Sequence, residues 1–211
     1  MNERQPVNRA GETGGATSSG NAIAIQLRQG VASDAAAIHA LITANLDAGH
    51  LLPRTFDDVE SHASRFVVAV TAGDVVGCGE LAPLSGAVAE VRSLVVDEQW
   101  RGQHAGVALV TALADRAREL GFVTLCAFTH QPSHFVRLGF SIVPHVWVPE
   151  KIAHDCTSCA LFRHCGQYAV SLALRPGVGL RLDPSAPPLR TVAPPRTSVE
   201  RLRLDEERVP A

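Results

Sequence analysis

The stretch that decides the fold runs from Glu90 to Val110 and reads EVRSLVVDEQWRGQHAGVALV. The valine-rich segment 88–96 predicts a strand, and the apolar stripe of 105–120 predicts an amphipathic helix that Gly121 ends. A turn of small and polar residues joins them. Backbone N–H groups at a helix start have no intrahelical acceptor and lie at the positive end of the helix dipole. This turn is therefore suited to hold a pyrophosphate.

The segments around this unit predict a sheet with helices packed on it. Alternating or bounded apolar runs indicate strands, and Ser33 and Thr55 mark the starts of two helices as N-caps. This order of elements predicts an α/β (α+β) fold with a mixed sheet. The further strands are predicted at 22–28, 66–70, 75–81, 122–128, 141–146 and 168–174, and the further helices at 33–48, from 55 onward, and at 132–138.

Composition divides the chain into three parts. Residues 1–21 are polar and rich in Gly, Ser and Thr, and we expect a disordered leader there. Six of the 13 prolines fall in 177–211, mixed with arginines and acids, which predicts a Pro/Arg-rich disordered tail. The part between them, 22–176, is long enough for one domain with its own core.

Charge and hydropathy exclude several kinds of partner. The formal net charge of -2 offers no electrostatic reason to bind nucleic acid or an anionic membrane. No apolar run approaches the roughly 18 residues that a membrane span needs, and the N-terminus lacks the apolar core of a signal peptide. Five cysteines, an odd number, are typical of reduced thiols. We therefore expect a cytoplasmic protein.

Two glycines in a strand-to-helix turn are weak evidence by themselves, because ordinary connections contain them too. The wider context is more specific. Arg101-Gly102-Gln103-His104-Ala105-Gly106 follows a valine-rich strand and resembles motif A of the GCN5-related N-acetyltransferase (GNAT) superfamily, Arg/Gln-x-x-Gly-x-Gly/Ala. Arg137-Leu138-Gly139-Phe140 resembles the Leu-Gly-Phe signature of that family. The resemblance covers about 23–175 and implies the GNAT fold, a central mixed and mostly antiparallel sheet flanked by helices.

Membership in this family would make the chain an acyltransferase that uses acetyl-CoA as co-substrate. The backbone at the end of the strand would then hold the thioester and pantetheine, and the turn and helix start would hold the pyrophosphate. The cofactor-binding residues that the resemblance implies are Leu94, Val95, Val96, Arg101, Gly102, Gln103, His104, Ala105 and Gly106.

Two residues depart from the family pattern. His104 stands where motif A usually has its first glycine, and a side chain is tolerated there if the residue is already helical and its N–H binds the phosphate. Phe135 stands where many members have the tyrosine that protonates the leaving CoA thiolate, and Phe has no proton to donate. Either the thiolate leaves without a protein acid, or His134 or a water supplies the proton.

An amine acceptor requires a base, because an ammonium group cannot attack a thioester until it has lost a proton. Glu90 is the candidate catalytic residue, since its strand position faces the reaction cleft in the resembled family. Glu80, on the neighbouring predicted strand, is the second candidate. For each of them, a solvated strand carboxylate is the alternative interpretation.

Several runs resemble the short, single-domain N-acetylglutamate synthases of arginine biosynthesis. This second resemblance implies L-glutamate as the small-molecule acceptor, whose two carboxylates need cationic or strong donor groups around them. Arg92 and Lys151, with Ser93 as a further donor, are the candidate substrate-binding residues. Lys151 is the only lysine of the chain, although a surface lysine is an alternative explanation. The runs are 52–54, 76–81, 89–94 and 149–165, the last reading PEKIAHDCTSCALFRHC.

The cysteine-rich end of the last run allows two interpretations. Cys156, Cys159 and Cys165, beside His154 and His164, are residue types that bind zinc, but a second CxxC pair is missing. We favour reduced cysteines that pack a loop and expect no metal. Two other functions stay open: acetyl transfer to a different amine, and a non-catalytic acyl-CoA-binding or zinc module. The sequence does not decide the oligomeric state, so a homodimer also stays open.

Overall fold

The structure, a computed structural model, describes residues 25–46, 51–159 and 161–175. The predicted leader, 1–21, and the predicted tail, 177–211, lie outside these residues. The three-part division of the chain therefore stays a prediction. No helix of the described residues is long and apolar enough to cross a membrane.

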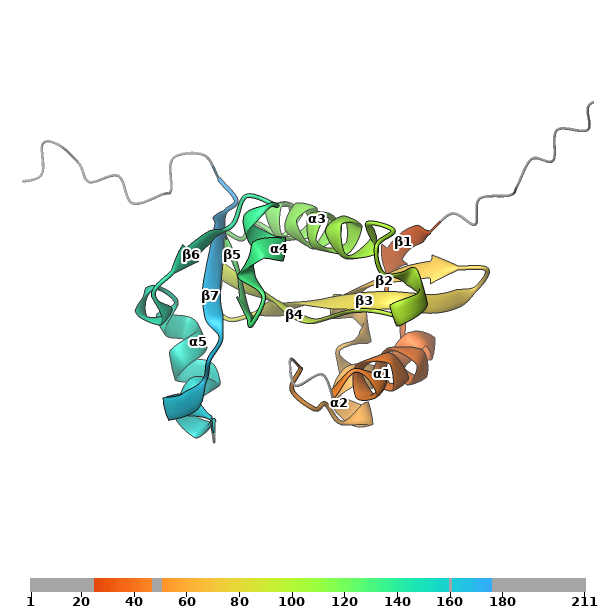
Figure 1. Cartoon of the computed structure of the whole chain (residues 1–211), viewed down its shortest axis with the longest axis horizontal. Coiled ribbons are helices and arrows are strands. Elements are labelled where there is room, and N and C mark those ends of the chain that lie inside the picture. The colour runs from red at the N-terminus through yellow and green to blue at the C-terminus, as the bar shows by residue number, and fades with distance from the viewer. Residues whose placement is uncertain (1–24, 47–50, 160, 176–211) are drawn as a thin grey trace, which may run out of the picture. The chain divides into compact units, whose positions relative to one another are not determined.

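A mixed sheet forms the centre of the fold, as predicted, and this sheet is open (Figure 1). Within the described residues it has seven strands in the order β1-β2-β3-β4-β5-β7-β6. Every neighbouring pair is antiparallel except β4 and β5, which are parallel. The strands are β1 Gln26–Gln29, β2 Phe66–Thr71, β3 Asp74–Pro83, β4 Val88–Val96, β5 Thr124–Thr129, β6 Ser141–Val143 and β7 Tyr168–Ala173.

Helices cover both faces of the sheet (Figure 1). Helices α1 (Ala35–Ala44) and α2 (Phe56–Ser61) pack on one face, and α3 (Ala105–Glu119) and α4 (Pro132–Val136) lie on the other. Helix α5 (Pro149–His154) follows β6 and was not predicted, because six residues that begin with a proline are too short to show a helical period.

The N-caps of the first two helices differ in how well the sequence predicted them. Thr55 caps α2, with its Oγ1 accepting a hydrogen bond from the N–H of Asp58 at 3.2 Å. Ser33, however, is not the cap of α1: it lies inside a 3-10 turn, and Asp34 takes the cap position. Asp34 is fixed there because its carboxylate also pairs with Arg28 at 2.6 Å.

Helix α3 buries its predicted apolar stripe against the sheet. Gly121 follows it with a φ of 86°, and the N–H of Phe122 donates to the carbonyl of Ala117 at 3.0 Å, which is the pattern of a Schellman cap. The helix therefore ends where the sequence predicted, to within one residue. Its buried residues are Ala105, Leu109, Val110, Leu113, Ala114 and Ala117.

A substitution at Leu113 tests how α3 packs on the sheet. It is fully buried and lies against Gly79 of β3, so we expect Leu113→Ala to lower the free energy of unfolding by about 2–5 kcal/mol through lost burial and a cavity. Leu120, just after the same helix, is 61% exposed, and Leu120→Ala should change this free energy by less than about 0.5 kcal/mol. Urea denaturation followed by circular dichroism measures both. Equal losses in the two variants would contradict the packing described.

Candidate active site

A β-bulge interrupts β4 at Ser93. Its φ of 48° lies in the left-handed region, and the register between β3 and β4 shifts at the same level, between Cys78 and Glu80. An extra residue in one strand bends that strand and increases its twist. The second half of β4 therefore does not continue in the line of the first.

Strands β4 and β5 are paired along only part of their length. Their parallel ladder joins 88–91 to 124–127, while β4 continues to Val96 and β5 to Thr129. The sheet is consequently open between the carboxyl ends of two parallel strands, and the described part of β5 offers no partner to the last residues of β4. Ligands of open α/β sheets bind at such carboxyl ends.

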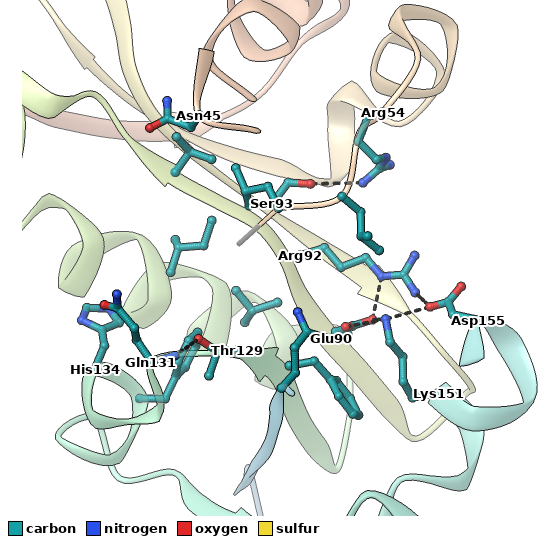
Figure 2. Close-up of a pocket in the computed structure, with 18 of the residues that line it drawn as sticks. Asn45, Arg54, Glu90, Arg92, Ser93, Thr129, Gln131, His134, Lys151 and Asp155 are labelled. Atoms are coloured by element: carbon teal, nitrogen blue, oxygen red, sulfur yellow. Dashed lines mark hydrogen bonds and ion pairs between the residues drawn. The ribbon is translucent and has the colours of Figure 1, made fainter. Parts of the chain in front are cut away.

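A cavity of about 670 Å³ lies at this opening (Figure 2). Its wall combines β4 and β5 with the end of α1, the segment before α2, α4 and the α5 region. In Figure 2, Asn45 and His134 lie toward one end, and Arg54, Lys151 and Asp155 lie toward the other. Its volume is typical of a site for a small ligand.

The end near Asn45 adjoins the start of α3. The first helical hydrogen bond runs from the N–H of Ala108 to the carbonyl of His104 at 3.0 Å, so the N–H groups of 105–107 have no intrahelical acceptor. Arg101 is held at the cavity wall, because its Nε donates to the Val96 carbonyl at 3.1 Å and its Nη2 to Asn45 Oδ1 at 2.7 Å. A guanidinium beside free N–H groups suits an anion.

The predicted cofactor-binding residues fall into two groups around this end. Leu94, Val95, Val96 and Arg101 line the cavity. The others form the turn before α3 and its first residues, next to the cavity rather than in its wall: Gly102, Gln103, His104, Ala105 and Gly106.

His104 is not helical, which corrects the interpretation made from the sequence. It is the N-cap of α3, with φ 62° and ψ 8°, in the left-handed region. Histidine adopts this conformation more readily than β-branched residues do, and only one residue has to adopt it. The side chain is exposed and makes no capping hydrogen bond.

Helix α4 places His134 and Phe135 on the cavity wall. Phe135 is buried and packs edge-to-face on Phe140, with ring centroids 5.2 Å apart. The Nε2 atom of His134 is buried and has no hydrogen-bond partner among the described residues. Burial lowers the pKa of His134 below its usual 6.5, and the charge of Arg137 lowers it further. This environment therefore favours the neutral ring.

At the other end of the cavity, four charged residues pair with one another: Glu90, Arg92, Lys151 and Asp155, which we call the Glu90 cluster (Figure 2). The Lys151 ammonium donates to both Glu90 oxygens, at 2.7 and 2.9 Å, and pairs with Asp155 Oδ2 at 2.8 Å. Arg92 Nε donates to Glu90 Oε2 at 2.6 Å, and Arg92 Nη2 donates to Asp155 Oδ2. Two cations and two carboxylates thus balance each other.

The Glu90 cluster joins parts of the chain that are distant in sequence. Glu90 and Arg92 are two apart in β4 and share a face, and Lys151 and Asp155 are one helical turn apart in the α5 region. The structure brings together the predicted Glu90, Arg92 and Lys151, but bonded to one another. Bonds to Lys151 and His154 and the charge of Arg92 outweigh burial and lower the pKa of Asp155.

Arg54 forms a second ion-pair group at this end. Its Nη1 donates to Glu80 Oε2 at 2.7 Å and to Ser93 Oγ at 3.3 Å, and its Nε pairs with Asp58. The predicted donor Ser93 therefore accepts a hydrogen bond from Arg54. Glu80, the second candidate base, is buried beside Arg54 and is not part of the cavity wall.

Sequence reasoning gave no role to Arg54 or Asp155, although both lie in runs that it singled out. Their partners, Glu80 and Arg92, lie 26 and 63 residues away. These two pairs are too far apart in sequence for a local pattern to show them. The local signals were a charged residue inside a run that resembles a family and an opposite charge four residues away, Asp58 for Arg54 and Lys151 for Asp155.

The cysteine-rich segment contributes Cys159 to the cavity wall. All five cysteines of the chain are free. Burial raises the pKa of Cys156, and it raises the pKa of Cys78 to about 12. In the described part of the chain, no group of three or more His, Cys, Asp or Glu side chains could hold a metal ion.

Known proteins match this chain in sequence. An uncharacterized N-acetyltransferase of Chlorobaculum tepidum is 30% identical over 138 residues, which are 65% of this chain and 89% of that protein. A model of the Acetyltransferase (GNAT) family matches residues 35–140. The chain belongs to the GNAT acetyltransferase family. It is therefore an acyltransferase, and the predicted family and fold class are confirmed.

This GNAT chain also matches part of longer proteins. The amino-acid acetyltransferase of Neisseria meningitidis is 29% identical over 136 residues, 64% of this chain and 31% of that protein. N-acetylglutamate synthase from Neisseria gonorrhoeae, complexed with coenzyme A and N-acetyl-glutamate, matches with a TM-score of 0.65 and 25% identity, over 72% of this chain and 35% of that one. The chain spans about a third of the length of these two relatives.

A shorter solved structure matches over nearly its whole length. This Mycobacterium tuberculosis protein, in complex with CoA, has a TM-score of 0.60 and 25% identity, and the match covers 71% of the GNAT chain and 99% of that one.

The backbone strain at His104, the left-handed N-cap of α3, can be tested by substitution. Because a side chain at positive φ is strained, we expect His104→Gly to raise the free energy of unfolding by about 0.5 kcal/mol, after the entropy of the unfolded chain is counted. His104→Val, β-branched, should lower it by more than about 1 kcal/mol. Thermal unfolding of the three proteins checks the order. A wild type more stable than His104→Gly would contradict the strain.

The ion pairs of the Glu90 cluster can also be tested by substitution. We expect Lys151→Met to lower the free energy of unfolding by about 3 kcal/mol, because buried Glu90 loses a partner. Adding Glu90→Gln should restore more than half of the loss, since the buried carboxylate that lost its partner is then gone and Asp155, which also loses Lys151, is partly exposed. As a control, Arg118→Met breaks an exposed pair with Asp115 and should cost less than about 1 kcal/mol. Additive effects in urea denaturation would show that the cluster does not act as a unit.

Proposed function

We propose that this GNAT enzyme transfers the acetyl group of acetyl-CoA to the α-amino group of L-glutamate and forms N-acetyl-L-glutamate, the first step of arginine biosynthesis. One observation carries the proposal: a single cavity has Arg101, near the start of α3, in its wall at one end and a cluster that contains Arg92 and Lys151 at the other. The first end suits a pyrophosphate, and the second suits carboxylates. The synthase from Neisseria gonorrhoeae, complexed with coenzyme A and N-acetyl-glutamate, supports this choice.

The donor half of the reaction uses the start of α3 and the open edge of β4. The N–H groups of 105–107 and the Arg101 guanidinium bind the pyrophosphate of acetyl-CoA. The pantetheine arm runs along residues 94–96, whose backbone has no β5 partner, and carries the thioester into the opening between β4 and β5. A backbone N–H there stabilises the oxyanion that forms on the carbonyl oxygen.

The acceptor half requires a free amine. Glu90 removes a proton from the α-ammonium group, directly or through water, once the acceptor carboxylates draw Arg92 and Lys151 toward themselves. The amine nitrogen then attacks the thioester carbon. A C–N bond forms, the C–S bond breaks, and the electron pair of that bond leaves with sulfur as the CoA thiolate.

The leaving thiolate takes up, through water, the proton that the attacking nitrogen loses when it becomes an amide, and His134 can donate a hydrogen bond to the sulfur. Phe135 has no proton to donate, whereas the neutral imidazole beside it lies on the cavity wall with an unpaired Nε2. One nitrogen of a neutral ring carries a hydrogen, which the ring can donate in a hydrogen bond to the thiolate without giving up the proton, because a neutral imidazole is a far weaker acid than a thiol of pKa near 8.5. We also place the enzyme in the cytoplasm, because all five of its cysteines are free thiols.

A thiol-release screen tests the substrate. Acetyl-CoA is incubated with the enzyme and each of the twenty amino acids, and the acetylated product is identified by mass spectrometry. We expect L-glutamate to give the fastest release. Release with another amine and none with glutamate would remove glutamate as the acceptor and leave the enzyme class intact.

Substitutions of two arginines at opposite ends of the cavity should affect the binding of different substrates. We expect Arg92→Ala to raise the KM for glutamate about 10- to 100-fold and to change the KM for acetyl-CoA by less than about 2-fold, because a charge-assisted hydrogen bond is lost only at the acceptor end. Arg101→Ala should do the reverse. Steady-state kinetics measure both constants. Parallel rises in the two variants would contradict this division of the cavity.

One observation favours a second candidate, acetyl transfer to a different amine. Both cations of the Glu90 cluster are already balanced by carboxylates, so this end of the cavity has little uncompensated positive charge. An amine with one carboxylate, or with none, would disturb that balance less than glutamate does. The same amino-acid screen, extended to simple amines, distinguishes the two candidates.

A further inference from the structure

The two carboxylates of the Glu90 cluster are not equivalent. Both contact Arg92 and Lys151, but the Glu90 side chain is 3% exposed and the Asp155 side chain is 30% exposed. Glu90 belongs to the central strand β4, where it lies opposite Ala82 of β3 on one side and Cys126 of β5 on the other. Asp155 is the residue that ends the six-residue helix α5. Asp155 is therefore the carboxylate that can leave the cluster with little change in the fold.

The position of Asp155 is the position that an acceptor carboxylate would need. Its Oδ2 atom accepts from Arg92 Nη2 and lies 2.8 Å from Lys151 Nζ, so one oxygen bridges the two cations that the proposed function assigns to the substrate. Its Oδ1 atom lies 2.8 Å from His154 Nδ1, on a side chain that is 56% exposed. All three cluster partners of Glu90 belong to the cavity wall.

Charge balance decides between adding a carboxylate to the cluster and exchanging one. The net charge of the four side chains is zero. A carboxylate added to the cluster would therefore lie close to two other carboxylates and be repelled by them. Exchange keeps the sum at zero, and a carboxylate that is already partly hydrated regains water easily. Exchange is therefore the favoured route for a carboxylate ligand.

We propose that Asp155 occupies the acceptor-carboxylate position in the substrate-free enzyme, and that a carboxylate-bearing acceptor binds by displacing Asp155 from Arg92 and Lys151. The proposal rests on the proposed function only in taking the acceptor to carry a carboxylate. Asp155 is then a specificity-determining residue: a ligand whose carboxylate bridges both cations compensates for the lost pairs, and a ligand without a carboxylate leaves Asp155 in place.

The experiment uses glutarate, a dicarboxylate that has no amine and cannot be acetylated. Its dissociation constant is measured by calorimetry for the wild type, for Asp155→Asn, and for Asp115→Asn, which removes an exposed acid of α3 outside the cavity wall. We expect Asp155→Asn to bind glutarate about tenfold more tightly than the wild type, because the competing carboxylate is gone. Asp115→Asn should bind it as the wild type does, and adding Arg92→Ala to Asp155→Asn should abolish the gain.

Equal or weaker glutarate binding by Asp155→Asn would overturn the proposal, and so would a gain that survives Arg92→Ala. If Asp155→Asn does not fold, Asp155→Ser takes its place under the same criteria. The readout is independent of acetyl transfer. If Asp155→Asn binds glutarate more tightly but the enzyme does not acetylate glutamate, glutamate is not the acceptor and the displacement of Asp155 stands. If the enzyme acetylates glutamate but Asp155→Asn does not bind glutarate more tightly, the proposed displacement is wrong and the proposed acceptor stands.

Discussion

At Ser93 the backbone of β4 adopts a left-handed conformation inside an otherwise regular strand, and the ladder to β5 stops just before it, after Val91. Everything at the site depends on this interruption. The last residues of β4 stay paired with β3 but have no partner in β5, so the sheet is open between two parallel strands. The chain then leaves β4 and enters α3 through one short turn, so the helix start and the free strand edge lie at the same cavity.

The bulge also changes which side chains share a face. Ala89 and Val91 belong to the core under α3, as alternate residues of a strand should, but the next residue packed against that core is Leu94, not Ser93. Glu90 and Arg92, which alternate with Ala89 and Val91 before the bulge, lie on the opposite face, where Lys151 and Asp155 pair with them. The extra residue therefore brings Leu94, instead of Ser93, to the apolar face of the strand.

Local patterns predicted the centre of the molecule well. The bounds of β4 are those predicted, and α3 ends one residue earlier, because a valine-rich run and a helical stripe closed by Gly121 are both local signals. Two details were wrong. Ser33 lost the cap position of α1 to Asp34, which Arg28 holds from β1, and His104 is the left-handed N-cap of α3 and not a helical residue.

By itself the sequence determined the family, the order of the elements and the turn before α3, since each depends on residues that are close together in the chain. It also singled out Glu90, Arg92 and Lys151, but only as separate residues. Tertiary structure alone decided that Arg92 and Lys151 both pair with Glu90 and with Asp155, and that Arg54 is held by Glu80 and Ser93. Ion pairs between residues up to 63 apart depend on how β4 and α5 approach in space, and no sequence period records that approach.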